Sequence, residues 1–518
     1  MEAPTATWIA YAAAWVSTIA LLLLAKHLRR RRKLHLPPGP KPWPIIGNLN
    51  LIGSLPHRSI HDLSQKYGPI MQLQFGSFPV VVGSSAEMAK TFLKTLDINF
   101  VDRYGPKNVA GKHLTYNFSN VTWSQYGPYW RQARRMFIME LFSAKRLDSY
   151  EHIRSHELKS MLHKLYNISS THHPILLKNY LFTLNLNVIS RMALGKSYLN
   201  ESRGAIVSPG EFKKLIDEVF LLSGVLNIGD LIPWVDFLDL QGYIRQTKAL
   251  NKKLDGFLEH VLDEHMSRRV VEGDDKFVAK DMVDVLLQYA DDPNMEVKIE
   301  RQGVKAFTLD LLAGGTESST VTVEWAISEL LKKPKVIKKA TDELDRVIGQ
   351  KRWVEEKDIP NLPYIQAIVK EAMRLHPVVP TLVPRLCRED CKVAGYDIPK
   401  GTRVLVSVWT IGRDPALWDN PTEFIPDRFI GRDIDIKGCD FELLPFGAGR
   451  RMCPGYSLGL KVIQVTLANL LHGFNWKLPN DMIPEQLNME EKFGLTTPKK
   501  IPLAVVIEPR LPMHVYSI

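Results

Sequence analysis

The chain has 518 residues, of which 45% are hydrophobic, 24% charged and 9% aromatic, and its formal net charge is +11. These proportions are ordinary for a globular protein, so they exclude a disordered chain, a collagen-like repeat and a low-complexity protein. Four cysteines without a Cys-x-x-Cys pair are too few for a disulfide-built scaffold and disfavour a cysteine-rich zinc site.

Most of the basic excess lies near the N-terminus, directly after an apolar run. Residues 1–45 hold seven Lys or Arg residues and one acid, and five of the basic residues form the block Arg29 to Lys33. The apolar run, Trp8 to Ala25, would span about 27 Å as a helix, close to the thickness of a hydrocarbon core. A signal peptide carries its basic residues before the apolar run, and a buried core helix would not end in such a block. The sequence therefore predicts a retained membrane anchor over residues 1–25, with its C-terminal side in the cytosol.

Residues 26–44 are expected to form a basic stretch and a proline-rich hinge. Five prolines fall between Leu36 and Pro44, so neither a helix nor a sheet can continue through this segment. We expect a stiff, extended spacer that holds the rest of the chain, residues 45–518, at a fixed offset from the bilayer.

Helical patterns predominate in residues 45–518. A short hairpin is expected within Tyr67 to Gly83 and short strands within Val378 to Val408. Helices are expected over residues 130–150, 151–194, 211–220, 243–270, 302–333, 336–349, 361–376 and 456–471, with a loop over 224–242 and a charged connection over 271–281. The predicted fold class is mostly α with a minor β-sheet region. No Rossmann fingerprint or P-loop is present, so any NADPH chemistry must take place on another protein.

The strongest chemical signal is the loop around Cys453. Gly449 and Gly455 would let a flat cofactor approach the backbone closely. Arg450, Arg451 and the start of the following helix would lower the pKa of the thiol. A thiolate with no second cysteine nearby suits a single axial bond to a metal; the alternative is a structural cysteine buried in a turn.

The longest predicted helix is weakened at its centre. Gly314 and Gly315 each cost roughly 1 kcal/mol relative to alanine in a helix interior. The hydroxyls of Ser318 and Ser319 can bond back to helix carbonyls and bend the helix. This weak point favours a groove for a ligand, and packing by small residues is the alternative.

These motifs together resemble the cytochrome P450 monooxygenases, and the resemblance covers the whole chain. Phe446-x-x-Gly449-x-Arg451-x-Cys453-x-Gly455 is similar to the haem-binding signature of that family. Further similarities are Trp130-x-x-x-Arg134, Glu371-x-x-Arg374, the segment Phe424 to Phe429, and an anchor and hinge of the endoplasmic-reticulum type.

The resemblance implies a cytochrome P450 fold with an N-terminal transmembrane helix, and a haem-binding catalytic domain over residues 45–518. Haem b would be held through the thiolate of Cys453, with Phe446 and Gly455 in the same loop. By family position, the two haem propionates would be bound by Trp130, Arg134, Arg385 and Arg451, because carboxylates out of bulk water need paired donors.

The resemblance also assigns residues beyond the haem loop. Glu371, Arg374 and Arg428 match the family's internal ion network, which fixes the cysteine loop. Glu317 matches the family's acid, and Ser318 stands where a threonine is usual; both are expected to serve in proton delivery during oxygen activation. Serine keeps the hydroxyl but lacks the methyl that limits its rotamers.

The implied protein is an endoplasmic-reticulum monooxygenase with its catalytic domain on the cytosolic face. Its expected partners are O2, NADPH–cytochrome P450 reductase and a small lipophilic substrate, and no nucleic acid. Several segments resemble plant flavonoid 3′-hydroxylase-like enzymes, and the Gly-Gly-Thr-Glu-Ser-Ser run resembles a neighbouring homoterpene-forming branch. The substrate therefore stays open between a phenolic ring and a terpenoid chain. The pocket walls expected from family position are residues 104–116, 221–226, 311–318 and 378–383.

Two other functions remain open at this point. A haem-thiolate isomerase or dehydratase would need no O2, but relatives of that kind often lack the alcohol that Ser318 supplies. A non-catalytic membrane haem carrier or sensor is the second alternative, and a substrate-induced spectral change would argue against it.

Overall fold

The computed structural model describes residues 34–103, 108–197, 208–273 and 277–517, together with Trp8, Tyr11, Ala14, Trp15, Ser17 and Thr18, which are helical. Most of the predicted anchor and basic stretch thus lies outside the described residues. Within the described part of the chain, no helix is both long enough and apolar enough to cross a membrane.

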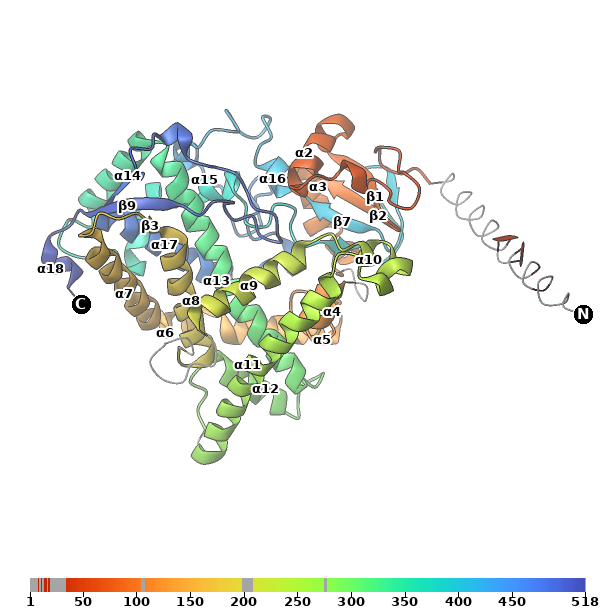
Figure 1. Ribbon diagram of the computed structural model, residues 1–518, viewed down its shortest axis with the longest axis horizontal. Coiled ribbons are helices and arrows are strands. Elements are labelled where there is room, and N and C mark those ends of the chain that lie inside the picture. Colours follow the sequence, from red (N-terminus) through yellow and green to blue (C-terminus); the bar gives the residue numbers. More distant parts are fainter. Residues whose placement is uncertain are drawn as a thin grey trace, which may run out of the picture.

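Helices form most of the described chain, as the sequence predicts (Figure 1). They are α2 (Pro56–Tyr67), α3 (Ala86–Lys90), α4 (Val109–Leu114), α5 (Pro128–Met136), α6 (Ala144–Ser149), α7 (Glu151–Ser169), α8 (Leu177–Leu194), α9 (Pro209–Gly224), α10 (Ile228–Leu231), α11 (Tyr243–Glu272), α12 (Met282–Asp291), α13 (Arg301–Leu331), α14 (Pro334–Val347), α15 (Pro363–Leu375), α16 (Val408–Ile411), α17 (Tyr456–Gly473) and α18 (Met513–Tyr516).

The strands make small sheets. β1 (Ile70–Phe75), β2 (Phe78–Gly83), β7 (Arg403–Val406) and β4 (Arg385–Leu386) form a four-stranded sheet, which lies with α2 and α3 at one end of the molecule (Figure 1). β3 (Ile175–Leu176), β9 (Ala504–Pro509) and β8 (Phe474–Lys477) form a second sheet, and β5 (Cys391–Val393) pairs with β6 (Tyr396–Ile398).

The hairpin predicted within Tyr67 to Gly83 is confirmed. β1 and β2 pair antiparallel, with Phe75 opposite Phe78, and the turn between them is possible because Gly76 has a φ of +55°. The valines of β2 then pair in parallel with β7, which ties this end of the sheet to a segment far along the chain.

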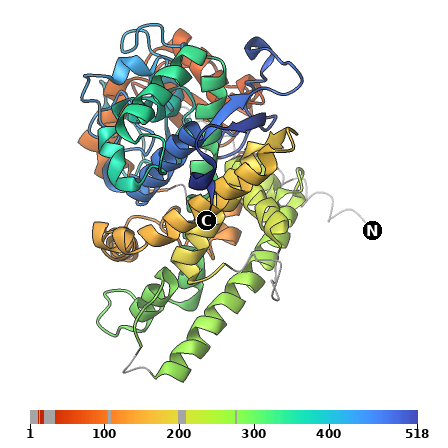
Figure 2. The same ribbon diagram turned by 90° about the vertical axis from the view of Figure 1, so that its left-hand side faces the viewer.

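Helix α13 runs through the middle of the helical part and contacts α8, α15 and α17 (Figures 1 and 2). Its residues are buried on nearly all sides, and Pro334 prevents its continuation. A Cβ added at Gly315 would lie 2.8 Å from Cγ1 of Ile189, whereas one at Gly314 would meet nothing within 4 Å. Gly315 therefore lets α8 approach α13, and Gly314 faces open space.

Several predicted elements differ in the structure. The helix expected over 130–150 breaks at a π-helical turn (Phe137–Leu141), and the one expected over 151–194 breaks before β3. The loop expected over 224–242 contains α10 and a 3-10 turn (Pro233–Leu238), while α12, β8 and β9 were not predicted.

The proline-rich hinge lies on the globular body from His35 onward. The Gln72 N–H donates to the carbonyl oxygen of Pro38 (2.8 Å), and a Cβ at Gly39 would lie 1.9 Å from the Gln72 oxygen. His35 and Asp397 are joined by two hydrogen bonds. This part of the segment is held against the sheets and is not a free spacer.

Candidate active site

A cavity of about 340 Å³ lies where α5, α8 and α13 meet the loop that carries Cys453. Its wall also includes residues 378–379, 382–383 and 385 and the pair Leu495 and Thr496. The predicted site residues that line this one cavity are Trp130, Arg134, Ser318, Arg385, Phe446, Arg451, Cys453 and Gly455.

The cysteine loop is shaped by local backbone bonds. The Cys453 N–H donates to the Phe446 carbonyl oxygen (2.9 Å), which closes the loop just before α17. Gly449 has a φ of +70°, and a Cβ there would lie 2.0 Å from the Leu93 carbonyl oxygen. Gly449 is therefore required by the turn and by Leu93, a different reason from the predicted approach of a cofactor. At Gly455 an added Cβ would meet only the Phe142 ring, at 3.6 Å, so protein packing leaves this side of the loop open.

Arg134 is the arginine that acts on the Cys453 thiol. Burial raises the pKa of Cys453, while the Gly455 N–H and the positive charge of Arg134 oppose that rise. Arg450 and Arg451, which the sequence led us to expect in this role, point elsewhere: Arg450 Nη1 lies 2.9 Å from a carboxylate oxygen of Asp97.

The other predicted propionate-binding residues already have protein partners. Trp130 Nε1 donates to the Val121 carbonyl oxygen (3.0 Å), and Arg385 pairs with Asp97 (2.6 Å). Arg451 donates to the carbonyl oxygens of Val101, Val121 and Ser124, and its guanidinium lies 4.2 Å from the centre of the Trp130 ring.

Arg134 differs from these residues. It lines the cavity, and it makes no hydrogen bond or ion pair with any residue that the structure describes. Burial lowers the pKa of its guanidinium, and the Cys453 charge counteracts this. A half-buried guanidinium is costly without an anionic partner, and the carboxylate of a bound ligand would be such a partner. The donors present therefore fit a flat cofactor that carries carboxylates and is ligated by Cys453.

The structure separates the two predicted catalytic residues on α13. Ser318 lines the cavity, and its Oγ donates to the Gly314 carbonyl oxygen (2.8 Å). Glu317 does not line the cavity; its Oε1 accepts from Lys178 Nζ of α8 (3.1 Å), and its side chain is 2% exposed. Burial raises the pKa of Glu317, and Lys178 opposes this shift.

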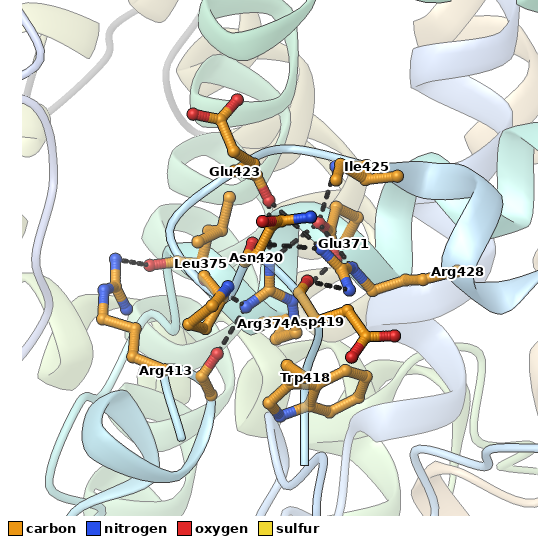
Figure 3. Close-up of polar contacts among 12 residues, drawn as sticks. Glu371, Arg374, Leu375, Arg413, Trp418, Asp419, Asn420, Glu423, Ile425 and Arg428 are labelled. Carbon is orange, nitrogen blue, oxygen red and sulfur yellow. Dashed lines mark hydrogen bonds and ion pairs between the residues drawn. The ribbon is translucent and has the colours of Figure 1, made fainter. Parts of the chain in front are cut away.

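Glu371, Arg374 and Arg428 form one enclosed network (Figure 3). Two Arg374 nitrogens donate to the two Glu371 oxygens (2.7 and 2.8 Å), and Arg428 Nε donates to Oε1 (3.1 Å). Arg374 also donates to the carbonyl oxygens of Gly412, Pro421 and Glu423, so it fixes the irregular segment that leads to the cysteine loop.

The pocket walls predicted from the sequence match the residues that line the cavity only in part. Leu311, Gly314, Gly315 and Ser318 line the cavity, as do the predicted residues of 378–383 other than Pro380 and Thr381. Residues 104–107 lie outside the described residues. Residues 108–116 and 221–226 do not line this cavity; Phe220 does, and Ser223 to Leu226 line a smaller cavity of about 120 Å³ beside it.

Sequence reasoning missed Arg103, which is buried, and Asp310, which is partly buried; both lie in the cavity wall. Asp310 Oδ2 accepts the N–H groups of Val121 and Thr122 (2.9 and 3.2 Å), and burial raises the pKa of Asp310 to about 6. A signal existed, because Asp310 is the one ionisable residue in the apolar run 306–315. Arg103 donates to backbone carbonyls far apart in sequence, which no local pattern reveals.

Comparisons with known proteins agree with this geometry. The model of the family described as Cytochrome P450 matches residues 37–504. A trimethyltridecatetraene synthase of Zea mays is 46% identical, covering 96% of this chain and 93% of its own length. A dimethylnonatriene synthase of Zea mays is 44% identical (98% and 98%), and a flavonoid 3′-monooxygenase of Petunia hybrida is 42% identical (96% and 97%). A solved zebra fish cytochrome P450 structure with abiraterone has a TM-score of 0.72 at 25% identity, covering 88% of this chain and 100% of that one.

Proposed function

Because this chain belongs to the cytochrome P450 family, we propose that it inserts one oxygen atom from O2 into a small lipophilic plant specialised metabolite. Family membership confirms the predicted resemblance and cytochrome P450 fold, and it makes the chain a P450 monooxygenase with haem ligated by a cysteine thiolate. Such enzymes act on small substrates with O2 and a redox partner. The specific electron source in our proposal is NADPH, through NADPH–cytochrome P450 reductase.

The observation that carries this proposal is that Cys453 and the unpartnered Arg134 face the same cavity. In our assignment Cys453 ligates the iron and Arg134 binds a propionate. Trp130, Arg385 and Arg451 build the wall around that carboxylate, and Phe446 and Gly455 line the face beside Cys453. Bound haem supplies the O2 activation.

The protein's own groups handle the proton. The Ser318 hydroxyl donates its hydrogen bond to the Gly314 carbonyl oxygen, so its lone pairs are free to accept a hydrogen bond from water in the cavity. Glu317, one residue earlier but turned toward Lys178, is assigned as a buried charge beside that path and not as a group that touches the substrate.

The substrate in this proposal is a terpenoid or a flavonoid-like phenolic. The relatives named for trimethyltridecatetraene and dimethylnonatriene favour a terpenoid, and the flavonoid 3′-monooxygenase favours a phenolic. Both hydroxylation and C–C bond cleavage are compatible products.

The test is to combine microsomes containing this protein with the reductase and to screen flavonoid and terpene alcohol panels. We expect product only with both NADPH and O2, and a reduced CO band at the position typical of thiolate ligation. Product formed without NADPH would favour the isomerase or dehydratase. A thiolate band without any substrate-induced spectral change would favour a haem carrier or sensor.

We also propose that residues 1–25 anchor the protein in the endoplasmic reticulum membrane, with the catalytic domain on the cytosolic face. Support comes from the apolar run ahead of the block Arg29 to Lys33. Deletion of residues 1–25 should release the protein partly from membranes, with residual binding through the basic block, and should keep the CO band. Unchanged membrane association, or loss of the band in the soluble protein, would contradict this.

A further inference from the structure

The cavity wall away from Cys453 and the arginines is largely aliphatic and aromatic. It includes Phe220, Leu311, Val378, Val379 and Leu495. A substrate that fills this region leaves water, so each of its polar groups needs a partner in the wall.

Most polar side chains in this wall are already occupied. Asp310 accepts hydrogen bonds from Asn120 Nδ2 and the Thr122 hydroxyl, besides two backbone N–H groups. Arg103 donates to the carbonyl oxygens of Thr122, Val383 and Pro384. These groups hold the wall together and leave little capacity for a ligand.

The donor hydrogens of two hydroxyls on α13 and of an amide on α8 are also already used. Ser318 donates to Gly314, and Thr322 Oγ1 donates to the Ser318 carbonyl oxygen (3.0 Å). Asn185 Nδ2 donates to Thr320 Oγ1 (2.9 Å), and its Oδ1, which has no partner among the described residues, is fully enclosed and out of a ligand's reach.

Two hydroxyls of the described wall remain without a hydrogen bond, those of Ser319 and Thr496. Ser319 lies one helical turn after Gly315, the residue that packs on Ile189, so it sits on the side of α13 that faces α8.

Thr496 lies within the apolar part of the wall. The preceding residue, Leu495, donates its N–H to the Phe220 carbonyl oxygen (3.0 Å), and the following residue, Thr497, donates to that of Val378 (3.0 Å). These two bonds fix Thr496 between Phe220 and Val378, with its buried side chain in the cavity wall.

This distribution discriminates between the two substrate classes. A polyphenol carries hydroxyls around its whole edge, and each one without a partner weakens binding, by roughly tenfold or more. A branched aliphatic chain with one hydroxyl matches an apolar wall that offers one well-placed hydroxyl.

We propose that the cavity accepts an aliphatic isoprenoid with a single hydroxyl group and that Thr496 forms the hydrogen bond to that hydroxyl. This inference rests on the proposed monooxygenase function and names its substrate class.

The test is spectral titration of the holoenzyme with three probes: farnesol, its hydrocarbon counterpart β-farnesene, and the polyphenol naringenin. For the wild type we expect farnesol to bind at least tenfold more tightly than naringenin. Thr496→Val should weaken farnesol binding by roughly fivefold to tenfold and leave β-farnesene binding unchanged. Thr496→Ser should restore farnesol binding. Thr322→Val is the matched control in the same cavity. It should not change the ratio of the farnesol and β-farnesene affinities, because the Thr322 hydroxyl already donates its hydrogen to the Ser318 carbonyl oxygen.

Two results would overturn the inference. Tighter binding of naringenin than of farnesol would reject the substrate class. Equal loss of farnesol and β-farnesene in Thr496→Val, despite an intact CO band, would show that Thr496 acts through packing only. Either result leaves the monooxygenase proposal standing, whereas an absent thiolate CO band in the wild type would overturn the monooxygenase proposal itself.

Discussion

Lys178 Nζ lies 3.1 Å from Glu317 Oε1, and both side chains are enclosed between α8 and α13. The second carboxylate oxygen of Glu317 has no hydrogen-bond partner in the part of the chain that the structure describes. Burial raises the pKa of Glu317, and Lys178 is the cation that favours the charged form of this carboxylate next to the weakened centre of α13.

We expect Lys178→Met to destabilise the folded protein by about 3–5 kcal/mol, because it leaves the Glu317 charge buried and unpaired. The double variant Lys178→Met/Glu317→Gln should recover much of this loss, since neither charge remains. Denaturant unfolding of the two single variants and the double variant gives the coupling energy. Additive losses, with no recovery in the double variant, would contradict a direct pair.

The network around Glu371 gives a second prediction. Arg374→Ala removes the bidentate ion pair with Glu371 and three hydrogen bonds to backbone carbonyls. We therefore expect the free energy of unfolding to fall by about 3–5 kcal/mol and haem retention to be poor. Arg374→Lys should rescue little, because an ammonium cannot reproduce the planar fork. The measurements are unfolding midpoint and haem content per protein.

Lys338→Met is the matched control, because Lys338 and Asp342 form an exposed i,i+4 pair. Its effect should stay below about 0.5 kcal/mol. If Arg374→Ala behaved like Lys338→Met, the network would not fix the cysteine loop.

The part of the site that could be predicted is the part that is local in sequence. The Cys453 loop, the Glu371–Arg374 spacing and the Gly314–Gly315 weak point are each contained within a few residues. By contrast, Asp97 pairs with Arg385 and Arg450, and no local pattern indicates a carboxylate so far away in the sequence. The sequence also does not show which side chain of α13 faces the cavity and which is buried, so it assigns both Glu317 and Ser318 to proton delivery.

The fold shows the same limit. Helix α13 could be predicted because its apolar run ends at Pro334, and the β1–β2 hairpin because its strands are adjacent. β3 and β9 pair across most of the chain, and short strands of this kind carry little pattern of their own. The π-helical turn Phe137–Leu141 interrupts a regular helical pattern and depends on tertiary packing.

The thiolate assignment predicts that Cys453→Ser abolishes the CO band typical of thiolate ligation. Only Cys453 lines the cavity; Cys387 is buried beside Cys391, with the sulfurs 3.9 Å apart, and Cys439 is exposed. Reduced-CO difference spectra of the four single serine variants test this, and the other three should keep the band. A surviving band in Cys453→Ser would remove the basis of the assignment.

Two residues of α2, His57 and Arg58, bond to the Glu491 carboxylate, and this predicts a contribution to folding stability that depends on pH. Burial opposes ionisation of Glu491, yet hydrogen bonds from His57 (2.9 Å) and Arg58 (2.8 Å) lower its pKa from 4.5 to about 2. The folded state thus binds fewer protons than the unfolded state between these values, so this contribution is complete above pH 4.5 and is lost as the pH falls toward 2.

We therefore expect Glu491→Gln to lower the free energy of unfolding by roughly 2–3 kcal/mol at pH 7 and by much less at pH 3. Urea unfolding of both proteins across this range measures the difference. An equal loss at both pH values would mean that the carboxylate charge contributes nothing and that only its shape matters.

Ser318→Ala should lower the product formed per NADPH consumed more than it weakens substrate binding. The Ser318 hydroxyl lines the cavity and keeps its lone pairs available, so its loss affects a proton transfer that follows binding. Loss of an acid–base group commonly costs a hundredfold or more, but we expect on the order of tenfold, because water can partly replace a serine hydroxyl. Peroxide should rise as coupling falls. The substrate dissociation constant, measured from the substrate-induced spectral shift, should stay within about twofold of the wild-type value.

Two variants control for this reading of Ser318. Ser318→Thr should match or exceed the coupling of the wild type, because the added methyl restricts the hydroxyl rotamer. Ser319→Ala removes a hydroxyl from the same cavity wall but from the side of α13 that faces α8, so its coupling should change little. NADPH depletion, peroxide and product on one substrate measure all three variants. Impaired coupling in Ser319→Ala with Ser318→Ala unaffected would move the proton path to the α8 side of the helix, where Glu317 and Lys178 lie.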